Sequence, residues 1–182
     1  MSKYPKLTVR DTRKYGKGVF AAEPIKKGSV IHVLSGKRLS VYDLVKNINA
    51  GKEFIDDPFQ IGKKTYLDLD ELSRTFNHSC NPSAGIRKTS ELFALRDIVA
   101  GEEVTYDYSL TVAPTVWSMK CKCGSTSCRK VIGDIRSLTK SQRNAYMHVG
   151  AVQRYMREII KQLDTKSYSI PSYELWALAN IQ

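Results

Sequence analysis

The most informative stretch of this sequence is Arg74-Thr75-Phe76-Asn77-His78-Ser79-Cys80-Asn81-Pro82. It is dense in small polar residues and ends in proline, so it predicts an irregular loop with buried hydrogen bonds. An Asn beside a His offers a ligand both hydrogen-bond donors and acceptors. For this segment alone, however, a pair that merely satisfies a turn is the better explanation.

Short extended segments lie on both sides of this loop. They are rich in β-branched and aromatic residues and are separated by Gly and Pro, which predicts a β-rich fold of short strands. We expect strands within residues 7–10, 19–22, 29–34, 59–69 and 91–98. A short helix is predicted over residues 40–50, with Ser40 as N-cap and Asp43 at the third helical position.

Two further segments become informative only in combination with the loop. The segment Gly101-Glu102-Glu103-Val104-Thr105-Tyr106-Asp107-Tyr108 reads as a strand, and residues two apart on a strand face the same side. The pair Tyr106 and Tyr108 would by itself usually be packing. The turn Gly16-Lys17-Gly18 alone is a weak indication of ligand binding.

Four cysteines are present, and three of them lie within eight residues, as Cys121-Lys122-Cys123-Gly124-Ser125-Thr126-Ser127-Cys128. Closely spaced thiolates can converge on one ion, and Gly124 permits the tight turn that this requires. Zinc takes four ligands, so Cys80 is the natural fourth. Two disulfides and four unrelated buried thiols are the alternatives, and the lack of an apolar N-terminal signal segment argues against disulfides.

In this order and spacing, the segments resemble the SET-domain lysine methyltransferases that carry a post-SET cysteine tail. The resemblance covers about residues 5–133 and rests on four matching segments. These are Gly16 to Ala21, Arg74 with Asn77 to Cys80, Gly101 to Tyr108, and Cys121 to Arg129. It implies the SET β-fold, in which small curved sheets are combined with a knot-like threading and the C-terminal helices pack outside.

The resemblance implies a binding site for S-adenosylmethionine. In the family the Gly-x-Gly turn approaches the methionine part of the cofactor, and the Asn-His pair grips it through the Asn side chain and the His backbone. Apolar residues of the tail lie beside the adenine. The residues at these positions are Gly16, Lys17, Gly18, Asn77, His78, Val131 and Ile132.

The resemblance also assigns the chemistry. Tyr108 takes the place of the catalytic tyrosine beside the cofactor and the lysine amine, and Tyr106 takes the place of the aromatic that sets how many methyl groups are added. Monomethylation with some dimethylation is therefore expected. The four cysteines would hold one structural zinc. The second tyrosine that many members carry upstream is not evident, with Phe59, Tyr42 and Tyr66 as candidates.

Two departures from the family pattern concern the Asn77 loop itself. Thr75-Phe76 replaces the usual Phe-Ile pair, and Ser83 replaces the final Asn. Both are expected to change local packing and to leave cofactor binding in place. The resemblance divides the chain into a SET domain over 5–115, a post-SET segment over 116–133 and a helical extension over 134–182.

The helical extension lies outside the resemblance. Apolar residues three and four apart predict one amphipathic helix over Ser141–Leu163, and a second short helix is expected after Pro171. We expect these helices to pack on the domain or on a second copy of it, which would make a homodimer.

Composition limits the partners. The chain carries 29 basic and 18 acidic residues, a net charge of +11, so a nucleic-acid partner and a basic surface without a partner are equally open. Residues 65–110 are net acidic, which suits a cationic substrate. No stretch is long and apolar enough to cross a membrane. A soluble intracellular protein, cytoplasmic or nuclear, is the expectation, although a secreted effector would also fit.

These observations support a protein-lysine N-methyltransferase acting on histones, ribosomal proteins or other basic proteins. The alternative is a zinc-stabilised basic module that binds nucleic acid or chromatin and transfers no methyl group. Intact Asn77, His78 and Tyr108 argue against that alternative.

Overall fold

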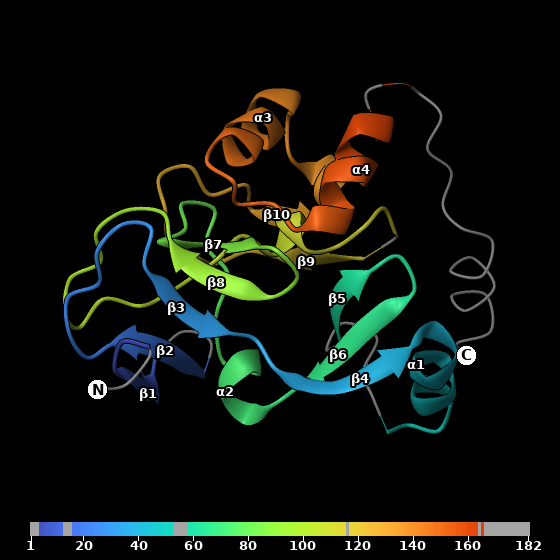
Figure 1. Cartoon of the computed structure of the whole chain (residues 1–182), viewed down its shortest axis with the longest axis horizontal. Coiled ribbons are helices and arrows are strands. Elements are labelled where there is room, and N and C mark those ends of the chain that lie inside the picture. The colour runs from blue at the N-terminus through green and yellow to red at the C-terminus, as the bar shows by residue number, and fades with distance from the viewer. Residues whose placement is uncertain (1–3, 13–15, 53–57, 116, 164, 166–182) are drawn as a thin grey trace.

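The computed structural model describes residues 4–12, 16–52, 58–115, 117–163 and 165. In these residues short strands form four separate antiparallel sheets with few helices (Figure 1), which confirms the predicted fold class. The sheets are β1 (Leu7–Asp11) with β2 (Lys17–Ala21); β3 (Val30–Val33), β8 (Glu91–Ala94) and β7 (Ala84–Arg87); β4 (Gly36–Ser40), β6 (Thr65–Leu69) and β5 (Phe59–Gly62); and β10 (Val131–Gly133) with β9 (Ser118–Lys120).

The helix predicted over 40–50 is present as α1 (Val41–Asn49). The Ser40 hydroxyl accepts a hydrogen bond from the Asp43 backbone N–H, and the Asp43 carboxylate accepts one from the Ser40 N–H, each at 3.1 Å. This reciprocal capping satisfies two donors that an isolated helix start would leave open. The other helices are α2 (Glu71–Arg74), α3 (Lys140–His148) and α4 (Arg154–Leu163), with the 3₁₀ turns η1 (Tyr108–Leu110) and η2 (Ile135–Ser137).

Two predicted strands are shorter than expected. The segment 59–69 is a hairpin of β5 and β6 that turns at Lys63-Lys64. In the segment 91–98 the strand ends at Ala94: the Leu95 N–H still donates to the Ser83 carbonyl beside β7, but Ile98 pairs with Ile25 instead. In both cases the alternation of apolar and polar residues indicated extended backbone. It did not indicate where pairing with the neighbouring strand ends.

The single helix predicted over Ser141–Leu163 is wrong, because the chain forms α3 and α4 with a break between them. Gly150 has a φ of +74°, a left-handed conformation that ends helices and that glycine adopts without a steric penalty. The apolar spacing continues across this break, which explains the error. The helix predicted after Pro171 lies outside the described residues.

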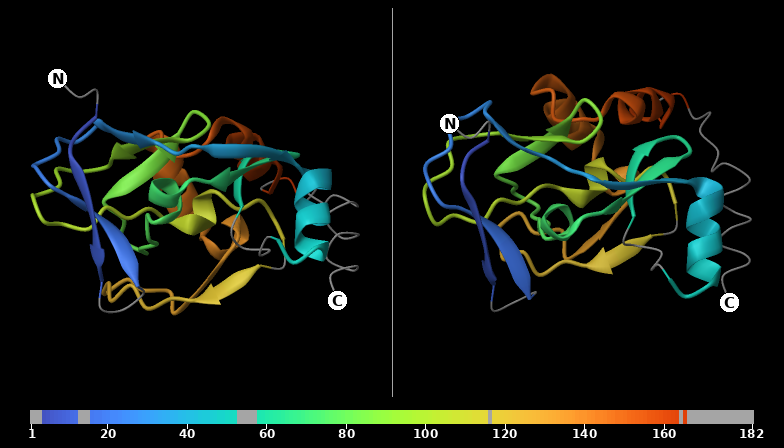
Figure 2. Two further views of the ribbon diagram at one scale, coloured as in Figure 1. Left: turned by 90° about the horizontal axis from the view of Figure 1, so that it is seen from below. Right: turned by 60° about the horizontal axis from the view of Figure 1, so that its bottom comes forward.

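Two groups of buried apolar side chains hold the structure together. The larger joins the N-terminal strands to the central sheet, and it includes Val19, Ile31, Phe76, Leu92 and Val104. The smaller joins α4 to the segment after Tyr108 through Leu110, Ile135, Leu138, Met156 and Ile159. Both views in Figure 2 show α3 and α4 against the body of the chain. The apolar side of α4, which had pointed to a dimer, is therefore buried within one chain.

The arrangement that forms the site is a crossing of two segments that are distant in sequence. His78 and Tyr106 form a parallel bridge, in which the Tyr106 N–H donates to the Asn77 carbonyl at 3.1 Å and the Ser79 N–H donates to the Tyr106 carbonyl at 3.2 Å. The predicted strand over 101–108 is wrong. Only isolated bridges occur there, and Tyr108 begins η1.

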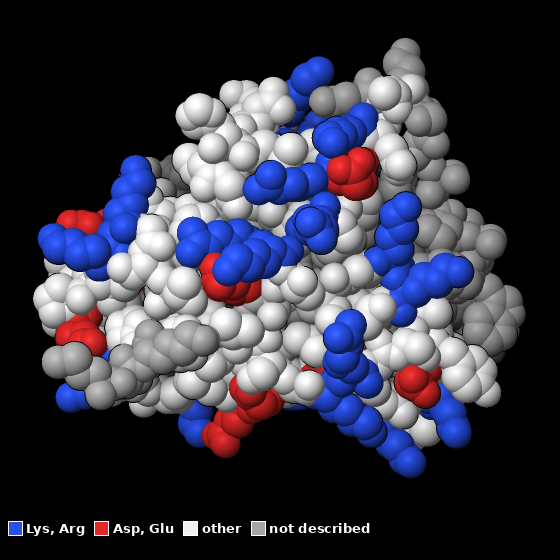
Figure 3. Space-filling model, viewed as in Figure 1, with Lys and Arg blue, Asp and Glu red and all other residues white. Residues whose placement is uncertain are grey.

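Charge is unevenly distributed over the surface. On the face that carries α4 and the β7–β8 and β5–β6 hairpins, Lys and Arg side chains outnumber Asp and Glu (Figure 3). Among the described residues, no helix is long and apolar enough to span a membrane.

Candidate active site and cysteine cluster

The crossing of the two segments brings Asn77 to the glycine turn. Its side-chain amide donates to the Lys17 carbonyl at 3.0 Å and to the Glu103 carboxylate at 2.8 Å. Both amide hydrogens are thereby used within the chain, so Oδ1 is the atom that Asn77 offers to a ligand. Three segments far apart in sequence thus meet at the Asn77 side chain.

Gly18 lies at the closest point of this meeting. A Cβ built there would come within 2.7 Å of Thr12 Cγ2 and 2.8 Å of Asn77 Nδ2, and closer still to Glu103 Oε1. A side chain at this position would displace the Glu103 and Asn77 side chains, so glycine is favoured here by close approach and not by its backbone angle. Gly16 is required for the opposite reason, since its φ is +80° while nothing lies within 4 Å of a Cβ there.

The His78 side chain is buried between the tyrosines and the cysteines. Its Nδ1 accepts from the Tyr108 backbone N–H at 3.2 Å, so the neutral ring carries its hydrogen on Nε2, which lies 3.3 Å from Cys80 Sγ. Burial, together with the positive charge of Arg129, lowers the pKa of His78 to about 3. Because residue 78 pairs with Tyr106 in a parallel bridge, its own N–H and C=O point away from that segment.

The two tyrosines lie against each other although they are not on a strand. Their ring centroids are 4.9 Å apart, and the Tyr108 hydroxyl donates to the Phe76 carbonyl at 2.8 Å. Burial raises the pKa of both phenols, and the Glu103 carboxylate adds to the effect at Tyr108. Both side chains are therefore neutral hydroxyls at physiological pH.

The structure separates the three candidates for the missing upstream aromatic. Phe59 is buried and meets Tyr106 edge to face, with ring centroids 6.4 Å apart. Tyr42 is 74% exposed on α1, and Tyr66 pairs with Leu39 and Gln60 inside the β4-β6-β5 sheet. Phe59 is the candidate in contact with Tyr106, and it carries no hydroxyl.

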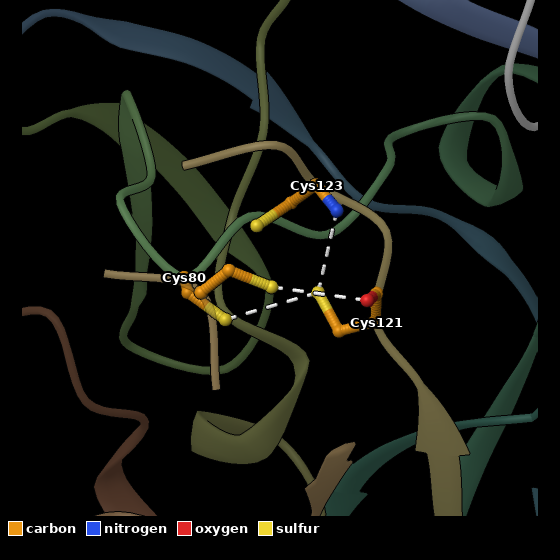
Figure 4. A group of neighbouring side chains, drawn as sticks. Cys80, Cys121 and Cys123 are labelled. Atoms are coloured by element: carbon orange, nitrogen blue, oxygen red, sulfur yellow. Dashed lines mark hydrogen bonds between the residues drawn. The ribbon is translucent and has the colours of Figure 1, made fainter. Parts of the chain in front are cut away.

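The four cysteines converge, and all are free thiols. Their sulfur atoms lie within 4.8 Å of one another, and Cys80 Sγ is 3.8 Å from Cys121 Sγ. In Figure 4 the side chains of Cys80, Cys121 and Cys123 point toward a common centre. Zinc–sulfur bonds of about 2.3 Å in a tetrahedron require sulfur atoms about 3.8 Å apart, so the cluster fits one zinc ion.

Backbone N–H groups surround this cluster. Those of Cys123, Arg129 and Lys130 donate to the sulfurs of Cys121, Cys80 and Cys128 respectively, at 3.4 to 3.5 Å. Such donors stabilise thiolate rather than thiol. The converging thiol side chains and the N–H groups that donate to them therefore match a metal site better than a set of four unrelated buried cysteines.

The residues expected beside the adenine divide into two kinds. Val131 is 56% exposed, whereas Ile132 is fully buried. They alternate on β10, which packs against η1 and thus lies near the tyrosines. Only Val131 presents a side-chain surface to a ligand.

Three contributors had no predicted role, namely Glu103, Asp107 and the carbonyl of Phe76. Asp107 is 1% exposed and accepts from the Arg129 guanidinium at 2.6 Å. A charged residue between two tyrosines in a buried segment was a sequence signal for an internal ion pair, since buried carboxylates are almost always paired.

Comparison with known proteins agrees with this geometry. The SET domain family matches residues 16–109. The chain is 32% identical over 139 residues to a variant-silencing SET domain-containing protein of Plasmodium falciparum, covering 67% of this chain and 5% of that protein. It is 31% identical over 134 residues to human histone-lysine N-methyltransferase 2B, covering 65% of this chain and 5% of that protein. It is 32% identical over 150 residues to an H3 lysine-36 specific histone-lysine N-methyltransferase of Debaryomyces hansenii, covering 71% of this chain and 19% of that protein.

Among solved structures, the methyltransferase domain of human histone-lysine N-methyltransferase SETMAR is similar, with a TM-score of 0.56 and 25% identity over 71% of this chain and 58% of that one. The chain thus spans a small part of the length of the curated relatives named above. The family match includes the glycine turn, the Asn77 loop and both tyrosines. From its sequence and its fold, the chain belongs to the SET domain family and has histone-lysine methyltransferases among its relatives.

Proposed function

We propose that this chain is a protein-lysine N-methyltransferase that uses S-adenosylmethionine. The observation that carries the proposal is the bridge between His78 and Tyr106. It pairs the backbone of the Asn77 loop, whose Asn77 side chain is bonded to the glycine turn, with the segment that carries the two neutral tyrosines. A ligand-binding amide and a hydroxyl that can orient an amine then belong to one site.

The residues present fit S-adenosylmethionine. The cofactor carries an ammonium group, and Asn77 Oδ1 and the Glu103 carboxylate both accept hydrogen bonds. The backbone of Gly16-Lys17-Gly18 can approach closely because residues 16 and 18 have no side chain. The outward-pointing N–H and C=O of His78 and the exposed Val131 complete the proposed cofactor contacts. Ile132 supports β10 from within the core.

S-adenosylmethionine supplies a methyl group attached to cationic sulfur. A lysine nitrogen would take up this methyl group as the carbon–sulfur bond breaks, and the electron pair of that bond would stay on sulfur. The nitrogen must first lose a proton to water, and burial beside the rings of Tyr106 and Tyr108 would favour the neutral amine. Tyr108 positions this amine and is too weak an acid at neutral pH to take part as an anion.

Tyr106 is proposed to limit the number of methyl groups. It is buried between Tyr108 and Phe59, so the space beside the amine is narrow. A hydroxyl at this place can hold a water molecule that a second or third methyl group would have to displace without replacing its hydrogen bonds. We therefore propose mainly monomethylation with some dimethylation.

The cysteine tail is proposed to form a post-SET zinc site. Cys80, Cys121, Cys123 and Cys128 would occupy all four positions of the ion, leaving none for a reactant, so the zinc would be structural. Cys80 belongs to the Asn77 loop and the other three to the tail, so the zinc would join the tail to the active site. The proposed division is a SET domain over 5–115, a post-SET segment over 116–133 and a helical extension from residue 134.

Histones are the proposed substrate class, because relatives of the chain are named histone-lysine methyltransferases. Ribosomal and other basic proteins also carry accessible lysines, so the deciding assay must compare them. We would incubate the chain with tritiated S-adenosylmethionine and matched panels of histones and ribosomal proteins. Transfer that is lost in Tyr108→Phe but retained in the exposed-site control Tyr42→Phe supports the proposal.

The second candidate is a zinc-stabilised basic binding module without transfer activity, which the basic face in Figure 3 favours. Titration calorimetry with S-adenosylmethionine separates the two. A folded, zinc-loaded chain that neither binds the cofactor nor methylates any protein of the panel would establish the binding module and end the enzyme proposal.

A further inference from the structure

The basic face is formed by α4, the β7–β8 hairpin and the β5 strand with its following turn. Over residues 59–64, 84–94 and 154–163 there are seven Lys and Arg residues against two acids, Glu91 and Glu158. The cations are Lys63, Lys64, Arg87, Lys88, Arg154, Arg157 and Lys161. This net charge of +5 comes from only 27 residues, so nearly half of the chain's net charge of +11 lies here.

Buried hydrogen bonds hold these three elements together. The fully buried Gln153 donates from Nε2 to the Thr89 carbonyl at 2.6 Å and to the Gln60 carbonyl at 3.0 Å. The Arg154 backbone N–H donates to the Lys88 carbonyl at 2.9 Å. The side chains of Lys88 and Arg154 therefore emerge from adjoining backbone that is fixed relative to α4.

In the β7–β8 hairpin and α4, five basic residues stand against two acids. Glu91 is shared by Arg87 and Lys88, and Glu158 contacts Lys161 at 3.1 Å. The Lys88 and Lys161 side chains are 72% and 65% exposed in these pairs. Glu158 is 58% exposed, so its pair with Lys161 contributes little free energy and a polyanion can replace this carboxylate, whereas Glu91 is only 13% exposed and remains the partner of Arg87.

We propose that this basic face binds the phosphate backbone of nucleic acid without reading its sequence. Cations gathered on elements that buried hydrogen bonds hold together suit a phosphate backbone, and release of counterions would drive binding. The aromatic residue of α4, Tyr155, is turned inward, with its hydroxyl donating to the Thr111 carbonyl at 3.0 Å, so it offers no ring for stacking on bases. The proposal is independent of the proposed methyl transfer.

An anionic membrane is a poorer partner for this surface. A helix that binds a membrane inserts an exposed apolar side, but the apolar residues of α4, Met156, Ile159 and Ile160, are buried in the chain. Among the described residues, none of the large exposed hydrophobic side chains lies in the three segments that form the basic face. The face therefore offers charge without an apolar anchor.

The test measures binding of the full chain to a fluorescent DNA duplex of about 24 base pairs by anisotropy, over roughly 50–200 mM salt. The variant Lys88→Gln/Arg154→Gln/Lys161→Gln removes three exposed charges from the face. The control Lys26→Gln/Lys27→Gln/Lys46→Gln removes the same charge from exposed residues elsewhere. Thermal unfolding confirms that both variants are folded.

The wild-type chain should show a slope of log K against log salt of about −4 or steeper, and the face variant should flatten it by about 3, with at least a tenfold loss of affinity at low salt. The control should change affinity less than about threefold. An RNA duplex of the same length distinguishes which nucleic acid is preferred.

Equal losses in both variants would show a general charge effect and overturn the proposal, as would the absence of wild-type binding at low salt. Polyglutamate that competes as well as DNA at equal charge would assign the face to acidic proteins. Equal binding to vesicles of phosphatidylserine and phosphatidylcholine in about equal parts would assign it to membranes. Either result also contradicts the proposal.

Discussion

The guanidinium of Arg129 donates to the carboxylate of Asp107 at 2.6 Å, so a residue of the cysteine tail is paired with the residue between the two site tyrosines. Asp107 is almost fully buried, and its burial raises the pKa of the carboxyl while Arg129 opposes that rise. The Asp107 carboxylate also accepts a hydrogen bond from the Ser109 N–H and thereby caps the start of η1. The cysteine tail and the segment of the two tyrosines are thus connected even apart from any metal.

We expect Arg129→Met to destabilise the chain by about 3–5 kcal/mol, because it leaves a buried carboxylate without its cation. Urea unfolding measures this change. The double variant Arg129→Met/Asp107→Leu should recover much of the loss, since neither charge then remains buried. Losses that simply add in the double variant would show that the pair is not coupled.

We predict one zinc per chain. Elemental analysis should find a zinc-to-chain ratio near one, and chelation should loosen the tail and lower affinity for S-adenosylmethionine. Cys123→Ser should lose the zinc, whereas Ser125→Ala in the same loop should retain it. A disulfide found by mass mapping, or purified folded chain without zinc, would contradict the assignment.

Asn77→Ala should weaken binding of S-adenosylmethionine by about 1–3 kcal/mol, because it removes Oδ1 and releases the Lys17 and Glu103 partners. Asn81→Ala, at an exposed position of the same loop, is the matched control. His78→Ala should lower affinity and stability together, since the ring also accepts the Tyr108 N–H. Calorimetry that finds Asn77→Ala binding as tightly as wild type would remove Asn77 from the site.

Gly18→Ala should reduce cofactor affinity while the fold survives. The added methyl group would push on Asn77, Glu103 and Thr12, so the two polar side chains must move. Gly62→Ala is the control, because a Cβ there would meet only Thr65 at ordinary distances of 3.7 Å and more. If both variants bind S-adenosylmethionine equally well, the close packing around Gly18 is not part of the cofactor site.

Tyr106→Phe should shift the product toward dimethyl- and trimethyl-lysine with the first methylation largely preserved. Tyr108→Phe should slow every step, because it removes the hydroxyl that is held by the Phe76 carbonyl. Intact-mass analysis of a modified peptide over time measures both effects. An unchanged product distribution in Tyr106→Phe would mean that its hydroxyl serves only packing against Tyr108 and Phe59.

Sequence reasoning reached the features that depend on local or strongly patterned signals. The capped helix at Ser40 was predictable because its hydrogen bonds link residues three apart. The convergence of the four cysteines was predictable because three of them are closely spaced in sequence and zinc takes four ligands, which leaves Cys80 as the fourth. The resemblance supplied the link between the Asn77 loop and the tyrosines, and the parallel bridge at His78 confirms that the two segments are adjacent.

Only the tertiary structure decided the partners of buried groups and the ends of the elements. The pairing of Asp107 with Arg129, the hydrogen bond from Asn77 to Glu103 and the ring contact of Phe59 with Tyr106 depend on how separate small sheets pack. The break at Gly150 was likewise decided by tertiary structure, because the apolar spacing typical of one helix continues across the two helices α3 and α4. Periodicity reports which residues are buried, whereas long-range packing determines what each of them contacts.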